Sequence, residues 1–151
     1  MNVKEQSQGE KIDAVIQQAL YCHIALSVDD QPYVIPVSYG YQDNALYFHS
    51  GPKGKKLELL KENPRVGFSI EHQVELKEAK SACKYSMLYA SVIGKGRAHL
   101  LESIEEKSRG LDIVVKHYNA EPLEYTEESL RSLEVIQIDI SEMTYKETRT
   151  G

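Results

Sequence analysis

The spacing of hydrophobic residues changes character near residue 21 of the chain. Before this point, hydrophobic residues recur at helical intervals: Ile12, Val15, Ile16, Ala19 and Leu20. This spacing predicts an amphipathic helix over residues 10–20. After it come three segments rich in β-branched and aromatic residues, separated by short turn-like links: residues 22–29, 32–42 and 45–51. We expect three antiparallel strands, with Pro36 at an edge or a bulge because proline cannot donate a ladder hydrogen bond.

The second half of the chain continues the same alternation of strands and helices. The pattern predicts these elements: a helix over 53–62, strands over 63–71, 87–102 and 134–147, a helix after Ser103 and a short helix after Thr126. Gly94 and Gly96 interrupt the long strand, which predicts a bulge or a close backbone approach. Six strands linked mainly by hairpins favour an α+β fold with a mostly antiparallel sheet, which closes most easily as a small barrel.

Composition narrows the class of protein. With 151 residues, 41% hydrophobic and 27% charged, the chain is expected to form one domain over residues 1–151. The net charge of −5 argues against a nucleic-acid-binding protein, and no apolar run approaches the roughly 20 residues of a membrane span. Two cysteines do not make a disulfide scaffold, so we expect a soluble cytoplasmic protein with free thiols.

The segment HSGPKGKKLELL (residues 49–60) carries lysines where a strand gives way to a helix. Lys55 and Lys56 lie at the positive end of the helix dipole, where carboxylates are preferred. A bound anion such as a phosphate, held by these lysines and by the free backbone N–H groups, would resolve the conflict. The alternative is a solvated helix in which the lysines pair with Glu58 and Glu62. The glycine spacing is not that of a Walker loop.

Two further segments carry candidate chemistry. His49 lies near a strand end, six residues before Lys55, where it could contact the same ligand or transfer a proton. The alternative is a hydrogen-bonded, half-buried histidine. The segment IPVSYG (residues 35–40) could lie against the rest of such a ligand, or it could be a core strand with an edge proline. Neither the five histidines nor the two cysteines show the spacing of a metal site, so no metal is expected.

From Ala19 to Arg97, the order of these segments resembles the FMN-binding split barrel of the pyridoxamine 5′-phosphate oxidase-like superfamily. The chain is most similar there to the nitroimidazole-resistance-type flavoproteins. The resemblance is most specific from Pro36 to Val66. It implies a six-stranded, mostly antiparallel split β-barrel with flanking helices, and FMN as the cofactor.

The resemblance also implies a set of cofactor-binding residues. Lys55 and Lys56 would hold the FMN phosphate, and the preceding strand would contribute His49 and Ser50. The polar edge of the flavin ring would lie along the segment Pro36, Val37 and Ser38. Members of the superfamily share the flavin between two subunits, which implies a homodimer in which Ser91 of the partner subunit reaches the cofactor.

The implied activity is that of an oxidoreductase that reduces a small, nitro-aromatic-like acceptor, with His49 as the catalytic acid or base. The chain has no tryptophan and ends in MTYKETRTG, so it lacks the substrate-binding segment of the vitamin B6 oxidases. The superfamily also includes haem-binding and deazaflavin-binding members. The alternative function is therefore a non-catalytic flavin or haem carrier, and a third is a cofactor-free interaction module.

Overall fold

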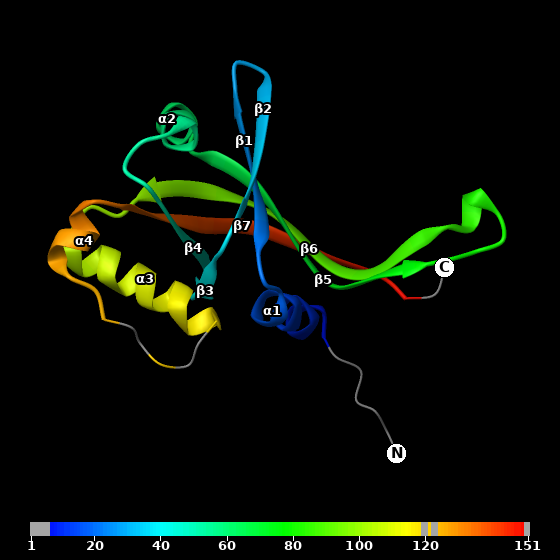
Figure 1. Cartoon of the computed structure of the whole chain (residues 1–151). Helices are drawn as coiled ribbons and strands as arrows, with labels where there is room; N and C mark the ends of the chain where they lie inside the picture. The colour runs from blue at the N-terminus through cyan, green and yellow to red at the C-terminus, as the bar shows by residue number, and fades with distance from the viewer. Residues whose placement is uncertain (1–6, 119–120, 122–123, 150–151) are drawn as a thin grey trace.

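The computed structural model describes residues 7–118, 121 and 124–149. Its strands are β1 (Cys22–Val28), β2 (Gln31–Val37), β3 (Gly40–Gln42), β4 (Ala45–Ser50), β5 (Arg65–Lys77), β6 (Ser86–Leu100) and β7 (Glu134–Thr148). Its helices are α1 (Gln8–Gln18), α2 (Lys55–Glu62), α3 (Ile104–Tyr118) and α4 (Glu127–Arg131), with a short 3-10 turn η1 (Ala82–Lys84). The strands form one curved antiparallel sheet in the order β2-β1-β5-β6-β7-β4-β3 (Figure 1). The α+β class is confirmed.

The expected count of six strands is wrong, because the predicted strand over residues 32–42 is two strands. The chain pairs with β1 as far as Val37 and pairs with β4 from Gly40 onward. Between them, the fully buried side chain of Tyr39 turns into the core, where its hydroxyl donates a hydrogen bond to the Ile16 carbonyl at 2.6 Å. Over the described residues the sheet consequently has seven strands and two free edges, β2 and β3, and it stays unclosed as a split barrel does. Pro36 lies on the edge strand, as expected.

The two glycines of the long strand have the roles that the sequence predicts. The ladder between β6 and β7 shifts register between Lys95 and Gly96, which marks the bulge. A Cβ atom on Gly94 would lie 2.2 Å from the ring of Phe68 on the neighbouring strand. The backbone of β6 therefore approaches Phe68 more closely than any other residue type would allow.

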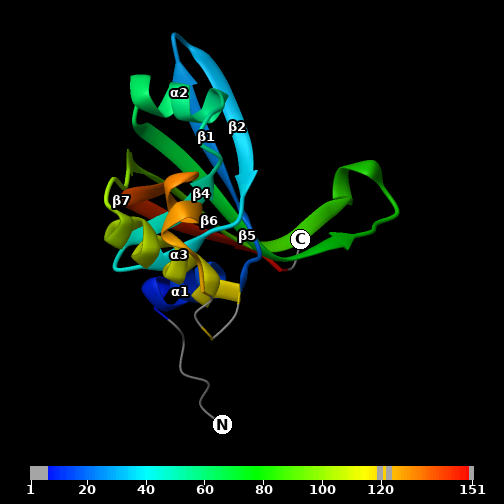
Figure 2. The same cartoon turned by 60° about the vertical axis from the view of Figure 1, so that its left-hand side comes forward.

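The inner side of the curved sheet holds the main core, closed by α1 on one side and by α2 on another (Figures 1 and 2). A smaller cluster lies under α3, on the opposite face of β4. Strand β4 is therefore buried on both faces until it reaches His49. None of the helices in the described ranges has the length and apolar character that crossing a bilayer requires.

Strands β5 and β6 continue well beyond the sheet. The prediction ended β5 at residue 71 and began β6 at residue 87, whereas the two strands pair as far as Lys77 and Ser86. Within the described residues, β1 pairs with β5 only up to Ser69, and β7 pairs with β6 from Tyr89 onward. Residues 73–88, called the arm below, are thus a two-stranded extension that points away from α2 in both views (Figures 1 and 2).

Candidate functional site

The end of β4 presents His49 and Ser50 next to the loop that leads into α2. Strand β4 pairs with β7 along its whole length and with β3 as far as Tyr47, so β7 holds the end that carries His49 and Ser50. Ser50 is buried, and its hydroxyl donates to the Gly51 carbonyl at 3.0 Å. The His49 side chain is exposed and takes part in none of the hydrogen bonds or ion pairs of the described residues. The structure thus leaves the His49 ring available to a ligand.

The start of α2 has no side-chain cap, although its first turn includes the acidic residue Glu58. Its N-cap is Gly54, whose φ of 146° suits glycine and whose missing side chain cannot cap the helix. The first two helical residues are Lys55 and Lys56, and none of the ion pairs in the described ranges includes either of them. The alternative pairing with Glu58 and Glu62 is absent there. Two lysines without carboxylate partners in the described ranges therefore occupy the first positions of α2, at the positive end of the helix dipole.

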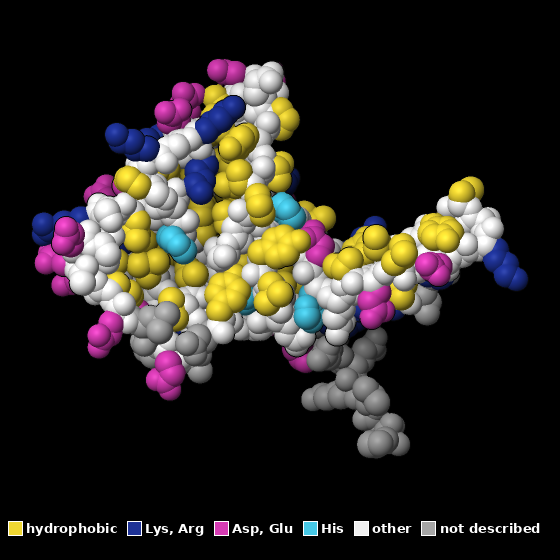
Figure 3. Space-filling model, in the orientation of Figure 1, with side chains coloured by type: hydrophobic (Ala, Val, Ile, Leu, Met, Phe, Trp, Pro, Cys, Tyr) yellow, Lys and Arg dark blue, Asp and Glu magenta, His cyan; other side chains and the backbone are white. Residues whose placement is uncertain are grey.

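Lys55 connects α2 to the edge strand β2. Its ammonium nitrogen lies 5.2 Å from the centroid of the Tyr33 ring, a cation–π contact worth about 0.5–1 kcal/mol at an exposed site. In Figure 3, dark blue side chains over α2 lie beside hydrophobic side chains along β2. The sequence analysis missed Tyr33, although its place on the same face of β2 as Ile35 and Val37 follows from strand alternation.

The segment Pro36–Ser38 contains the last two residues of β2 and the first residue of the link to β3. Val37 is in the core, whereas Pro36 and Ser38 are exposed. Gly40 and Tyr47 form the last ladder pair of β3 and β4, so Ser38 and His49 each lie two residues beyond the same pair. The chain therefore brings Ser38, His49 and the start of α2 to one end of the split between the edge strands.

Tyr118, at the end of α3, was not predicted as a site residue. Its hydroxyl accepts a hydrogen bond from the Tyr39 backbone N–H at 3.0 Å and donates one to the Leu20 carbonyl at 2.5 Å. These two bonds fix the backbone just after Ser38 and leave the Tyr118 ring 45% exposed. No spacing motif identifies such a contact, because Tyr39 and Tyr118 are 79 positions apart.

Ser91 is not brought to this group. It lies on β6 between Glu71 and Lys146, is buried, and donates its hydroxyl to the Lys146 carbonyl at 3.3 Å. On β7, Val135 pairs with His49 of β4, and the next residue, Ile136, pairs with Leu100 of β6. Leu100 therefore marks the position on β6 that is level with His49. Ser91 comes nine residues before Leu100, about 30 Å away along a strand. A single chain therefore leaves Ser91 far from His49 and the lysines.

The charges and pKa values limit what this group of residues can do. Burial, followed by the charge of Glu71, raises the pKa of the Cys22 thiol to about 12, and burial also raises the pKa of the Tyr39 phenol. Neither is a thiolate or phenolate near neutral pH. Side chains of His, Cys, Asp and Glu in the described ranges form no cluster that could hold a metal. The exposed lysines and free N–H groups fit a dianion such as a phosphate ester.

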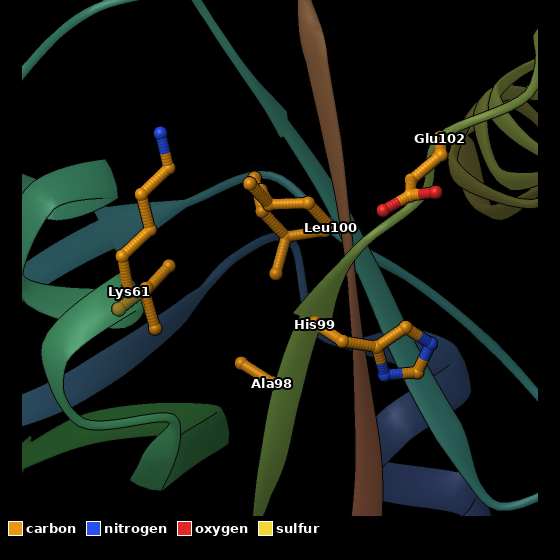
Figure 4. A pocket seen from close by; sticks show the side chains of 7 residues that line it. Lys61, Ala98, His99, Leu100 and Glu102 are labelled. Carbon is orange, nitrogen blue, oxygen red and sulfur yellow. The ribbon is translucent and has the colours of Figure 1, made fainter.

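A separate pocket of about 250 Å³ lies between α2 and the end of β6 (Figure 4). Its floor is formed by Leu60, Ala98 and Ile136. Lys61 and Glu102 border it from opposite sides, and the Nδ1 atom of a third polar side chain, His99, lies 3.5 Å from an Asp139 carboxylate oxygen. This pocket contains none of the residues predicted for the cofactor.

Comparison with known proteins identifies relatives along most of the chain. The family model described as pyridoxamine 5′-phosphate oxidase matches residues 8–147. A segment of 72 residues, 48% of this chain, is 32% identical to an uncharacterised protein of Rhizobium meliloti. That segment spans about half of the relative, 47% of its length.

Solved structures share the whole fold. A proposed 5-nitroimidazole antibiotic resistance protein from Bacteroides thetaiotaomicron is 30% identical, with a TM-score of 0.80 over 96% of this chain and 85% of that one. An FAD and heme binding protein from Mycobacterium smegmatis has a TM-score of 0.82 at 20% identity, covering 97% and 73% of the two chains. The flavocytochrome of Azotobacter vinelandii has a TM-score of 0.79 at 20% identity, covering 97% and 69%. At 20% identity the likeness concerns the fold.

Proposed function

The chain belongs to the pyridoxamine 5′-phosphate oxidase family, and we propose that it binds FMN with the cofactor phosphate at the start of α2. The observation that carries this proposal is the pair Lys55 and Lys56, which lacks carboxylate partners in the described ranges and follows an uncapped Gly54. Charge-assisted hydrogen bonds to a phosphate contribute about 1.5–3 kcal/mol each. Phosphate binding explains why cations occupy helix positions that otherwise favour carboxylates.

The flavin ring would then lie along the split between the edge strands β2 and β3. Pro36 and Ser38 are exposed there, and the Tyr39–Tyr118 hydrogen bond holds the backbone beside them. Backbone groups of Pro36, Val37 and Ser38 would contact the polar edge of the ring. The buried Ser50 would support the turn between the ring and the phosphate through its bond to Gly51.

We also propose that the protein is a homodimer that shares its flavin. Ser91 lies about 30 Å along β6 from the strand position beside His49, too far to serve the site of its own chain. Ser91 of the partner subunit can reach the cofactor if the two chains pack around a two-fold axis.

The proposed reaction is the reduction of a small nitro-aromatic-like acceptor. The relative at 30% identity is described as a 5-nitroimidazole antibiotic resistance protein, which supports this substrate class. Bound FMN supplies the electron transfer, and the protein supplies binding, orientation and electrostatics. The exposed ring of His49 beside Ser38 is the side chain that could hold or deliver a proton at the ring edge.

His49 can act in one of two ways, and one substitution separates them. If His49 positions the cofactor, His49→Asn raises the dissociation constant of FMN and leaves turnover of the loaded protein unchanged. If it transfers protons, the variant keeps its FMN affinity and loses about 10²- to 10⁴-fold in rate. We expect positioning, because no carboxylate or carbonyl among the described residues orients the ring. Normal affinity combined with normal turnover would remove His49 from the site.

The second candidate function is a non-catalytic flavin or haem carrier, which the unanchored His49 ring favours. The absorbance spectrum of the purified protein distinguishes flavin, haem and neither. Steady-state turnover with NAD(P)H and a series of nitro-aromatic acceptors then tests catalysis. We expect a flavin spectrum and acceptor-dependent oxidation of the donor. A haem spectrum, or a flavin spectrum without turnover for any acceptor, would favour the carrier.

A further inference from the structure

The pocket of about 250 Å³ between α2 and the end of β6 has an apolar floor. Leu60, Ala98 and Ile136, which form this floor, belong to the main core, and Leu100 adds a half-buried side chain beside them. Pockets for drug-sized ligands measure about 300–1,000 Å³, so this pocket suits a smaller molecule. Its lining favours a ligand with an aliphatic body, because hydrocarbon would then lie against hydrocarbon.

The rim of the pocket carries one positive and one negative side chain. Lys61 and Glu102 lie on opposite sides of Leu100 (Figure 4). Both are exposed, and neither takes part in a hydrogen bond or an ion pair within the part of the chain that the structure describes. The third polar lining residue, His99, is next to Asp139 instead. The two rim charges are therefore available to pair with complementary charges of a ligand.

The backbone that carries Lys61 is held in place at the end of α2. Leu60, the preceding residue, is buried in the core. The end of the helix is also tied to β1, because the side-chain amide of Asn63 donates a hydrogen bond to the Ser27 carbonyl at 2.7 Å. One side of the rim is thus fixed before any ligand binds.

The backbone that carries Glu102 is held on both sides. The N–H group of Leu101 donates a hydrogen bond to the Val135 carbonyl at 2.9 Å. On the other side, the Ser103 hydroxyl caps the start of α3 by accepting a hydrogen bond from the Glu106 N–H group at 3.1 Å. A ligand that pairs with both charges therefore requires no rearrangement of the backbone, which lowers the cost of binding.

We propose that this pocket binds an ω-amino carboxylate, a short aliphatic molecule with a carboxylate at one end and an ammonium group at the other. The carboxylate would pair with Lys61 and the ammonium group with Glu102, while the methylene chain would lie over the apolar floor and Leu100. A ligand with a single charge would leave one rim charge without a partner. The pocket contains none of the residues proposed to hold FMN, so the inference goes beyond the proposed function and does not rest on it.

Three six-carbon probes test the two charges: 6-aminohexanoate, hexanoate and hexylammonium. Titration of the full chain is followed by the NMR methyl signals of Leu60, Leu100 and Ile136, which locate the ligand. We expect 6-aminohexanoate to shift these signals and to bind at least about 10-fold more tightly than either of the other probes. Equal affinities for the three probes, or unchanged methyl signals at millimolar ligand, would overturn the proposal.

Two substitutions assign the ends of the ligand. In Lys61→Met, 6-aminohexanoate should bind no more tightly than hexylammonium, and in Glu102→Gln no more tightly than hexanoate. Lys116→Met and Glu105→Gln make the same charge changes at exposed positions of α3 outside the pocket, so these matched controls should keep the 10-fold preference. Circular dichroism checks that all four variants are folded. Loss of the preference in the controls as well, or its persistence in the two rim variants, would refute the site. The titrations need no FMN, so a failure of the proposed function would leave their outcome unchanged.

Discussion

Strands β5 and β6 run through both the body of the sheet and the arm. Their hydrophobic side chains are buried in the body and exposed in the arm. In the body, alternate residues of β5 such as Val66, Phe68 and Ile70 are buried in the core. The bulge that follows His72 adds one residue to β5, so the apolar residues beyond it, Val74 and Leu76, lie on the face opposite the core and are exposed. Alternate apolar residues of β5 are therefore buried under the helices before the bulge and exposed to solvent after it.

The difference indicates where each region obtains its stability. The body buries its apolar face within one chain, so its contacts determine the unfolding free energy of the monomer. The arm has no intramolecular partner for its apolar face, and a second chain would have to supply one. The lysines at the start of α2 also lack an intramolecular partner, since no carboxylate in the described ranges forms an ion pair with them.

The largest effect expected is in the body. Phe48 is 1% exposed in the main core, and Phe48→Ala should lower the unfolding free energy by about 3–5 kcal/mol through lost burial and a cavity. Glu78→Ala in the exposed arm should change it by less than about 0.5 kcal/mol. Urea unfolding at one fixed protein concentration measures both. Similar losses for the two variants would contradict the division between body and arm.

Two glycine substitutions sharpen the comparison within the backbone. Gly94→Ala forces a methyl group against Phe68 and the Glu142 carbonyl, and should cost about 1–3 kcal/mol of unfolding free energy. Gly51→Ala, in the loop before α2, meets nothing within 4 Å and should be nearly neutral. Thermal melting of both variants tests this, and a neutral Gly94→Ala would mean that β6 and β5 are farther apart than described.

The body also has an expected alkaline weakness that comes from Cys22. Its pKa is raised from 9.0 to about 12 on folding, so its contribution to stability is complete below pH 9 and declines as pH rises toward 12. Between pH 8 and 10.5 the unfolding free energy should fall by about 2 kcal/mol from this group alone. Urea unfolding of Cys22→Val, which has no thiol, should show a shallower loss than wild type over this range. Equal pH dependence would contradict the assignment.

The smallest effect expected is at the start of α2. Lys56→Glu replaces an unfavourable charge at the helix N-terminus with a favourable one and should raise the unfolding free energy of the ligand-free protein by about 0.3–1 kcal/mol. The same substitution should abolish FMN binding. Melting without ligand and titration with FMN measure the two effects. Loss of stability together with unchanged binding would contradict the proposed anion site.

The fold could be predicted from the sequence where one local pattern controls one element. The caps at Ser103 and Thr126 and the breaks at Asn63-Pro64, Gly94 and Gly96 all have their predicted consequences. The split of residues 32–42 could not be predicted, because it depends on the buried hydrogen bond of Tyr39 to a distant helix. The arm was missed because its alternation is short, with Val74 and Leu76 followed by a mainly polar run over residues 77–84, and because no turn motif marks its tip.

The candidate site was predicted in the same uneven way. Local sequence singled out the lysines, His49 and the segment over residues 35–40, and the family resemblance added Ser50 and the contacts of Pro36–Ser38 with the flavin. Tyr33 and Tyr118 were missed because their roles depend on contacts between distant segments. The role of Ser91 stays a prediction, since it depends on a second chain.

The most direct test of the proposed cofactor site is a thermodynamic cycle between two ligands and two proteins. FMN and riboflavin differ by the phosphate, and the wild type differs from the Lys55→Ala/Lys56→Ala variant by the groups proposed to bind that phosphate. Fluorescence titration should show that the variant binds FMN 10²- to 10⁴-fold more weakly, about 3–6 kcal/mol, while riboflavin binds both proteins equally. An equal loss for both ligands, or unchanged FMN affinity, would contradict the assignment of the phosphate to the start of α2.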